Sequence, residues 1–392
     1  MMAEKIRLGI IGIGNMGSTH AKNVAAGKCP DFVLTAVADI KPDRLAWAAA
    51  ELPASVKRYD SAEALLEHGE VDACMICVPH YDHPKYAIAC MQRGIHVMVE
   101  KPAGVYTKQV REMNEEAKRH PDVVFGMMFN QRTNCIYRKV RELVQSGTYG
   151  GIRRTNWIIT NWYRPQAYYD SGDWRATWAG EGGGVLLNQC PHQLDLWQWI
   201  CGMPVSVEAK LSYGLWHDIE VEDDVTAYVK YANGATGVFV TTTGDAHGTN
   251  RLEIQLDRAR IVVEGGKISL LVYEMTEQAF SKTNTEPFAT VAASKSEVET
   301  DGENPQHVGV INAWGGAILR GEPLVADGSE GINGLTLSNA MHLSSWLGRE
   351  VKLPLDEELF YSELMKRVAG SKKKTNVKEA VADTAATYGG NG

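Results

Sequence analysis

Residues 6–17 read IRLGIIGIGNMG, a short apolar strand pattern followed at once by the glycine motif G-x-G-x-x-G. A helical pattern follows the motif, and Asp39 ends the next predicted strand 22 residues after Gly17. The motif alone is a weak signal, but a preceding strand, a following helix and an acidic residue at this distance make it specific. The stretch therefore predicts a Rossmann unit that binds a dinucleotide.

Each residue of the motif has a physical task in such a unit. Gly12 permits the tight turn, Gly14 lets the backbone approach the pyrophosphate, and Gly17 lets the helix pack against the strand. The backbone amides around Asn15 and Met16 then face the phosphates, because the N-terminus of a helix favours negative charge.

The residues after the second predicted strand indicate which cofactor is bound. The Asp39 carboxylate can accept hydrogen bonds from both ribose hydroxyls of NAD, and it would repel the 2′-phosphate of NADP. Lys41, two residues later, partly offsets that repulsion. We therefore expect NAD rather than NADP, with Ile40 also beside the cofactor.

The remaining chain predicts two domains of different fold class. Residues 6 to about 125 alternate β-branched runs with helical patterns, which is typical of a parallel, doubly wound α/β sheet. From residue 152, alternating apolar and polar residues predict an α+β domain on a large, mainly antiparallel, open sheet. The expected limits are 1–128 for the NAD-binding domain, 129–358 for the substrate-binding and oligomerisation domain, and 359–392 for a C-terminal helix and loosely packed tail.

Individual elements follow from the same patterns. Predicted strands of the first sheet are 7–11, 33–38, 73–78, 96–99 and 123–127. Predicted strands of the second sheet are 152–161, 205–215, 226–231, 237–243, 251–256 and 260–264. Two further helices are expected near 193–200 and 305–319.

Composition excludes several classes of protein. The 392 residues include 40 basic and 48 acidic side chains, and the formal net charge of −8 disfavours nucleic acid and anionic membranes as partners. The only basic run, residues 372–374, is expected to be a solvated tail. No apolar stretch is long enough to span a bilayer, and no signal peptide is recognisable, so we expect a cytoplasmic protein.

The seven cysteines favour reduced thiols over a disulfide framework, because their number is odd and they are scattered. Cys74 and Cys77 form a C-x-x-C pair inside a predicted buried strand. Residues three apart on a strand point to opposite faces and cannot share a ligand. We therefore expect core packing and no metal site.

Two further motifs identify a family resemblance when they are added to the glycine turn. EKP (residues 100–102) follows a predicted strand at its carboxyl end, where open α/β sheets bind ligands, and GGGVLLNQCPHQLD occupies residues 182–195. With PHYDH (residues 79–83), the chain up to about Pro354 resembles the Gfo/Idh/MocA family, which includes glucose-fructose oxidoreductase and inositol dehydrogenase.

The resemblance implies roles for three residues. Lys101 would contact the substrate hydroxyl and the nicotinamide ribose, and a cation there stabilises a developing alkoxide. His192 matches the family's general base in the motif D-x-x-x-H. Asn188 stands where relatives have aspartate, so it can orient His192 or bind a hydroxyl but cannot carry charge. At i, i+4 spacing, Asn188 and His192 would share one helical face.

Other candidate residues surround these three. Around the cofactor, the resemblance implies Pro79, His80, His83 and Glu100, with His83 ordering its loop. For the substrate we expect Asn130 and Arg132, and also Tyr163, Arg164, Trp174 and Arg175 from a segment rich in aromatic residues and arginine. Aromatic faces with nearby fork-shaped donors suit a polyhydroxylated ring.

The expected function is NAD-dependent hydride transfer to or from a secondary hydroxyl of a sugar, glycoside or cyclitol. Two alternatives remain open on the sequence. One is an NAD-dependent glycosidase or lyase that acts through a transient keto-sugar, which shares the same motifs. The other is a non-catalytic sugar or NAD sensor, and the only feature that favours it is Asn188, which stands where relatives have aspartate. The broad sheet with one face left over favours a homodimer or homotetramer.

Overall fold

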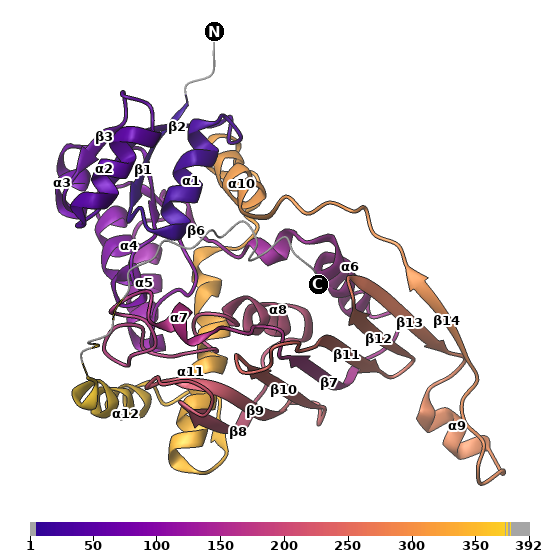
Figure 1. The fold of residues 1–392 in the computed structure, drawn as a ribbon. Coiled ribbons are helices and arrows are strands. Elements are labelled where there is room, and N and C mark those ends of the chain that lie inside the picture. Colours follow the sequence, from indigo (N-terminus) through magenta and orange to yellow (C-terminus); the bar gives the residue numbers. More distant parts are fainter. Residues whose placement is uncertain (1–4, 373, 375–376, 378–392) are drawn as a thin grey trace.

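The computed structural model describes residues 5–372, 374 and 377, which form two sheets with helices around them (Figure 1). The first sheet has the strand order β3-β2-β1-β4-β5-β6, and all neighbouring strands are parallel. Its strands are β1 (Ile6–Ile11), β2 (Phe32–Ala38), β3 (Lys57–Tyr59), β4 (Ala73–Ile76), β5 (His96–Val99) and β6 (Phe125–Met127). The predicted doubly wound parallel sheet is confirmed, and β3 is an additional strand.

The crossover helices place the ligand-binding edge of this sheet. They are α1 (Asn15–Ala25), α2 (Pro42–Glu51), α3 (Ala62–His68), α4 (His83–Met91) and α5 (Thr107–Arg119). The chain runs outward from β1 toward β3 on one side and from β4 toward β6 on the other. Such a reversal opens a crevice at the carboxyl ends of the central strands, where nucleotides bind in open α/β sheets.

The second sheet has nine strands in the order β14-β13-β12-β11-β7-β10-β9-β8-β15. They are β7 (Ile152–Ile159), β8 (Ser206–Tyr213), β9 (Glu222–Lys230), β10 (Thr236–Thr242), β11 (Asn250–Leu256), β12 (Ala259–Glu264), β13 (Lys267–Tyr273), β14 (Ala293–Val298) and β15 (Val351–Lys352). Neighbours are antiparallel except β7 and β10, which are parallel. The predicted large, mainly antiparallel sheet is confirmed, and sequence patterns did not identify its last three strands.

Helices cover one face of the second sheet. They include α6 (Cys135–Gln145), α8 (Pro191–Cys201) and α11 (Gly331–Leu347), and Trp197 of α8 stacks on Phe239 of β10 with ring centres 5.4 Å apart. The opposite face is partly exposed and carries Ile158 and Tyr228, each 39% exposed. The short elements α7 (Gln166–Tyr169), η1 (His80–Asp82), η2 (Asn130–Thr133) and η3 (Gly328–Glu330) lie in connections.

One helix of the second half packs on the first sheet. α10 (Gln306–Arg320) buries Val310, Ile311 and Trp314, and the Trp314 ring stacks on Phe32 at 5.2 Å. The chain therefore returns to the Rossmann sheet after the second sheet is complete. The limits at residues 128 and 358 stay a prediction, and α10 lies within 129–358 while it packs on the first domain.

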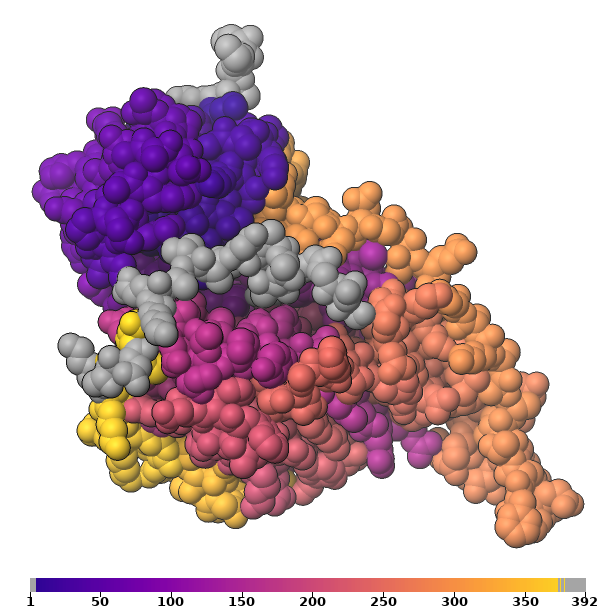
Figure 2. Space-filling view, viewed as in Figure 1, coloured from indigo at the N-terminus to yellow at the C-terminus, as the bar shows by residue number. Residues whose placement is uncertain are grey.

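An arm extends from the edge of the second sheet. It carries α9 (Glu277–Thr283) and β14, and it projects away from the rest of the molecule (Figure 2). None of the residues of α9 is buried. The helix of the arm therefore contributes nothing to the core, whereas Val298 of β14 packs against it.

The C-terminal segment corrects one expectation. After α12 (Glu357–Gly370), Ser371 donates a hydrogen bond to Glu220 at 2.5 Å, and the Lys374 ammonium donates to the Tyr169 carbonyl at 2.6 Å. The basic run was expected to be solvated, but Lys374 is half-buried because this contact draws it onto the second domain. Of the tail expected from residue 370 to 392, residues 373, 375–376 and 378–392 lie outside the described residues.

Two other sequence predictions concern the membrane and the cysteines. In the described part of the chain, no helix is both long and apolar enough to cross a membrane. All seven cysteines are free thiols, and Cys74 is fully buried in β4. Cys77 lies one residue beyond that strand.

Candidate active site

The glycine turn between β1 and α1 has the geometry of a phosphate-binding loop. Gly12 has a φ of +87°, and a Cβ atom there would lie 2.6 Å from the Cys77 carbonyl oxygen. A Cβ atom on Gly17 would lie 1.9 Å from the Gly12 carbonyl oxygen, so α1 packs directly on the turn. Around Gly14 the space is open, because no atom lies within 4 Å of a Cβ built there.

The first turn of α1 is also free to bind an anion. Gly14 is the N-cap residue and makes no side-chain capping bond, and the first turn holds no acidic residue. Its amides and the positive end of the helix dipole therefore suit a pyrophosphate. Together with the open space at Gly14, these residues fit a dinucleotide.

Asp39 lies at the carboxyl end of β2, beside the glycine turn. Its carboxylate accepts hydrogen bonds from the backbone amides of Ile13 at 2.8 Å and Lys41 at 2.9 Å. Arg44 donates to the Ile13 carbonyl oxygen at 2.7 Å and packs on the Trp47 ring. A carboxylate held in this way has oxygen lone pairs left for a ribose diol. Arg44 supports this turn and was not identified from the sequence. Ile40, the next residue after Asp39, is 81% exposed.

The loop after β4 is tied to the loop after β5. The two ring nitrogens of His83 lie 2.6 Å from the Pro102 carbonyl oxygen and 2.7 Å from the Val78 carbonyl oxygen. His83 is fully buried, so its geometry is that of a residue that holds the loop. His80 beside it is buried against Trp174, with ring centres 5.8 Å apart, and Pro79 begins the η1 turn that contains it.

Glu100 is a buried carboxylate directly behind Lys101. Its Oε1 atom lies 2.6 Å from Nε2 of His20 on α1, and its Oε2 atom accepts a hydrogen bond from the Lys101 amide at 3.1 Å. Burial opposes ionisation, but the hydrogen bond and charge of His20, with the charges of His307 and Lys101, lower the pKa of Glu100 to about 2. The His307 ring packs on His20 at 5.4 Å.

Lys101 and the 182–195 motif meet at the carboxyl edge of β5. The Lys101 ammonium donates a hydrogen bond to the Asn188 backbone carbonyl at 3.0 Å. The expected helical face shared by Asn188 and His192 is wrong, because α8 begins at Pro191 and residues 185–189 form turns. The contact with Lys101 therefore comes from this turn, and only His192 lies on the helix.

His192 lies in the first turn of α8 and is 1% exposed. Its ring packs against Phe129 at 6.3 Å. Burial and the positive charges of Lys101 and His307 hold the pKa of His192 well below its usual value near 6.5, while Glu100 opposes them. The imidazole is therefore neutral at pH 7, as a general base must be.

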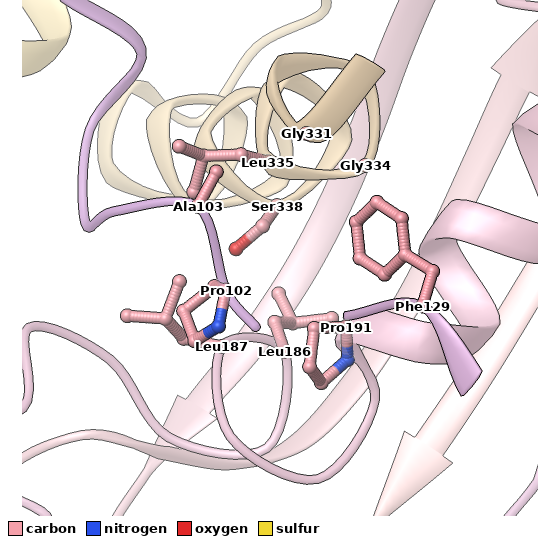
Figure 3. Close-up of a pocket in the computed structure, with 10 residues that line it drawn as sticks. All are labelled: Pro102, Ala103, Phe129, Leu186, Leu187, Pro191, Gly331, Gly334, Leu335 and Ser338. Carbon is pink, nitrogen blue, oxygen red and sulfur yellow. The ribbon is translucent and has the colours of Figure 1, made fainter. Parts of the chain in front are cut away.

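A small apolar cavity lies between the segments that carry Lys101 and His192. Pro102 and Pro191, their immediate neighbours, line it together with Leu187 and with Leu335 of α11 (Figure 3). The cavity measures about 10 Å³, room for one water molecule at most and too little for a sugar. It is packing space between the two segments and not the substrate site.

Glu181 supplies a carboxylate beside Asn188. The Asn188 side-chain amide donates to Glu181 Oε1, and the Ala176 backbone amide donates to Oε2 at 2.6 Å. Burial raises the pKa of Glu181, which is 2% exposed, although the charge of Arg175 opposes this. Asn188 thus contacts a carboxylate, and no hydrogen bond to His192 is seen for its side chain among the described residues.

The aromatic and arginine residues form a connected cluster next to this turn. The Tyr168 hydroxyl accepts hydrogen bonds from Arg175 at 3.1 Å and from the Gln189 side chain at 3.2 Å. The guanidinium of Arg175 lies 4.6 Å from the Trp174 ring centre. Arg164 packs on the same Tyr168 ring, while Tyr163 is 42% exposed. Tyr168, Gln189 and Glu181 are absent from the sequence-based set of site residues.

Asn130 and Arg132 were expected at the substrate, and their side chains are engaged by other residues of the chain. Arg132 forms a buried bidentate ion pair with Asp195, at 2.8 and 2.7 Å, and a further ion pair with Glu330. Asn130 is fully buried and donates to Gln306 of α10. Arg132 lines a separate groove of about 690 Å³ beside α6, and none of Lys101, Asn188 and His192 lines that groove.

Comparisons with known proteins match both halves of the chain. Residues 6–127 match the oxidoreductase family with an NAD-binding Rossmann fold, and residues 137–262 match the GFO/IDH/MocA C-terminal domain. Myo-inositol 2-dehydrogenase of Thermotoga maritima is 29% identical over 272 residues, which are 68% of this chain and 78% of that protein. D-glucoside 3-dehydrogenase of Escherichia coli K12 is 27% identical over 252 residues, 60% of this chain and 69% of that protein.

Among solved structures, the WlbA dehydrogenase of Chromobacterium violaceum, in complex with NADH and UDP-GlcNAcA, is similar over most of its length. The TM-score is 0.76 and the sequence identity 28%, with 91% of this chain and 98% of that chain covered. The shared fold therefore extends over both sheets.

Proposed function

This chain belongs to the Gfo/Idh/MocA family of NAD-binding oxidoreductases, and we propose that it transfers a hydride between NAD and a secondary hydroxyl or ketone of a sugar, glycoside or cyclitol. The relatives named above act on inositol and on a glucoside, as their names state. One observation carries the proposal. Lys101 and the turn before His192 are joined by the 3.0 Å hydrogen bond to Asn188, beside the glycine turn of an NAD-binding domain.

The cofactor would be held by the α1 amides after Gly14, by Asp39 at the ribose, and by the loop around Pro79 and His80. Bound NAD supplies the acceptor for a hydride from the carbinol carbon. Because Asp39 carries a negative charge beside the glycine turn, NAD is preferred to NADP.

The reacting oxygen would lie between Lys101 and His192. In the direction of oxidation, neutral His192 takes the hydroxyl proton, and the Lys101 ammonium stabilises the negative charge that develops on the oxygen. In reduction, protonated His192 returns the proton to the same oxygen. Glu181 keeps the Asn188 amide in place, so Asn188 positions the turn that receives Lys101.

A screen of sugars, glycosides and inositols for nicotinamide reduction, with NAD and with NADP, tests this proposal. We expect NADH to accumulate with at least one compound, and Lys101→Ala to lower kcat by about 100-fold or more, on the scale of losing one electrostatic stabiliser. Lys57→Ala, at an exposed lysine in β3, is the matched control and leaves the rate unchanged. An undiminished rate for Lys101→Ala contradicts the mechanism, and glycoside cleavage without net NADH contradicts the reaction.

We also propose that the chain works in the cytoplasm as a homodimer or homotetramer, with residues 1–128 holding the cofactor and 129–358 the substrate. Seven free thiols support a reducing compartment. The partly apolar open face of the second sheet, with Ile158 and Tyr228, supports association. Light scattering at several protein concentrations measures the mass, and a monomer at all of them contradicts the assembly.

A further inference from the structure

Two arginines at the expected substrate site pack on the same tyrosine ring. Arg164 and Arg175 are half-buried, and their guanidinium carbons lie 5.2 and 4.8 Å from the Tyr168 ring centre. Neither forms an ion pair with any carboxylate among the described residues, although Arg132 of the same chain forms two. The usual partner of a guanidinium in a partly buried site is a carboxylate or a phosphate.

Hydrogen bonds connect Arg175 to Gln189, in the turn that also binds Lys101. Arg175 donates to the Tyr168 hydroxyl, which also accepts from Gln189, and Gln189 directly follows the residue whose carbonyl receives Lys101. Gln189 is 5% exposed, and its Oε1 atom has no hydrogen-bond partner among the described residues. An acceptor of this kind would suit a hydroxyl of the same ligand.

The charges of Lys101 and of the two arginines act on side chains near this turn. Burial raises the pKa of the Cys190 thiol to about 12, and the charges of Arg164 and Lys101 both act against this rise. Burial also lowers the pKa of His80, and the charges of Lys101 and Arg175 add to that effect. The geometric link among the three cations runs through Tyr168, on whose ring both arginines pack, and through Gln189, which bonds the Tyr168 hydroxyl next to the residue that receives Lys101.

Carboxylates and a further lysine also lie near these arginines. Burial raises the pKa of Glu181 while the charge of Arg175 opposes this, and Asp170 accepts a hydrogen bond from the Gln166 side chain. Lys374 adds a further positive charge where its ammonium contacts the Tyr169 carbonyl. Arginine and lysine side chains thus gather at this part of a chain whose formal net charge is −8.

We infer that the substrate carries an anionic group, a carboxylate or a phosphate, which Arg164 and Arg175 bind while Lys101 and His192 act on a hydroxyl of the same molecule. The action of Lys101 and His192 on a hydroxyl of this molecule rests on the proposed function. It narrows the substrate class from polyols in general to acidic or phosphorylated sugars.

Matched pairs of ligands test the inference. D-glucuronate against D-glucose tests the carboxylate, and D-glucose 6-phosphate against D-glucose tests the phosphate, with the galactose series as a second set. Two readouts are measured for the full chain: kcat/KM for NADH formation, and the shift in melting temperature when the ligand is added with NADH present. We expect at least one anionic member to exceed its neutral partner by about tenfold or more, on the scale of a charge-assisted hydrogen bond.

Variants of the two arginines test whether these residues cause the preference for anionic ligands. Arg175→Gln and Arg164→Gln are each expected to remove the preference for the anionic member, measured as the ratio of kcat/KM for the anionic and the neutral member of a pair. Arg175→Lys is expected to retain part of the preference for the anionic member that Arg175→Gln removes. Arg93→Gln, at an exposed arginine near the end of α4, is the control and retains the preference.

The outcomes separate this inference from the proposed function. Equal or better use of neutral sugars overturns the inference and leaves the dehydrogenase proposal intact. Stabilisation by anionic ligands that depends on Arg175, without NADH formation from any compound, supports the inference and contradicts the proposed function. An anionic preference that survives both arginine variants overturns the assignment to these residues.

Discussion

The buried pair His20 and Glu100 offers the most quantitative prediction. The two side chains are 2.6 Å apart, with His20 fully buried and Glu100 5% exposed. Replacing His20 by leucine leaves the carboxylate buried with the Lys101 amide as its remaining hydrogen-bond donor among the described contacts. We expect His20→Leu to destabilise the protein strongly at pH 7, because an unpaired buried charge is costly.

The magnitude follows from the ionisation of Glu100. Burial opposes it, but His20, His307 and Lys101 lower the pKa from 4.5 to about 2, which corresponds to about 3 kcal/mol at 1.36 kcal/mol per pKa unit. Breaking a buried ion pair costs about 3–5 kcal/mol, the same order. Since the folded pKa lies below the unfolded one, this stabilisation is complete above about pH 4.5 and is lost as the pH falls toward 2.

Urea unfolding followed by tryptophan fluorescence is the assay, on a cycle of His20→Leu, Glu100→Gln and the double variant. We expect a coupling energy of about 2–3 kcal/mol at pH 7, decreasing as the pH is lowered toward 3. His68→Leu, at a histidine whose side chain is 65% exposed, is the control and changes the free energy of unfolding by less than about 0.5 kcal/mol. A coupling energy below about 0.5 kcal/mol at pH 7, or one that does not depend on pH, refutes the reasoning.

Three further predictions follow. Asp39→Ser removes the charge that repels a 2′-phosphate, so the ratio of kcat/KM with NADP to that with NAD should rise by about tenfold or more, and an unchanged ratio contradicts the role of Asp39. Burial and the charges of Lys101 and His307 hold the pKa of His192 well below 6.5, so kcat/KM should show no loss centred near pH 6.5 and should fall only in more acidic solution. A decrease of kcat/KM centred near pH 6.5 contradicts a buried neutral base. Trp314→Ala should lower the free energy of unfolding by about 3–5 kcal/mol in urea titrations, since this fully buried ring stacks on Phe32, and a loss under 1 kcal/mol contradicts the packing of α10 on the first sheet.

Local patterns predicted most of the fold because buried parallel strands are continuous apolar runs. β4 and β5 were found in this way, since they are almost wholly buried. β3 was not found, because Lys57–Tyr59 is a short polar strand at the sheet edge. The helix at 306–320 was predicted within two residues, but nothing local indicates that Trp314 packs on Phe32 of the other half.

Sequence patterns identified only part of the candidate site. The motif residues Gly12, Lys101 and His192 were identified because each belongs to a recognisable string. The helical pairing of Asn188 with His192 failed, although Pro191 was a usable signal, because proline favours the first turn of a helix.

The partners of buried polar groups lay beyond local sequence patterns. His20 meets Glu100 across 80 positions, and Glu181 meets Asn188 through a turn, so neither pairing has a sequence period. Arg132 was expected at the substrate because of its place in the chain, yet its guanidinium is bound by Asp195 and Glu330. Burial decides such contacts, and burial depends on the whole fold.

A crystal structure with NADH and a sugar that reduces NAD in the screen tests the central claim most directly. The account predicts that one substrate oxygen lies within about 3.2 Å of both the Lys101 ammonium nitrogen and a ring nitrogen of His192, next to the nicotinamide. A substrate oxygen that contacts neither side chain, or a sugar bound in the groove beside α6 instead, would contradict it.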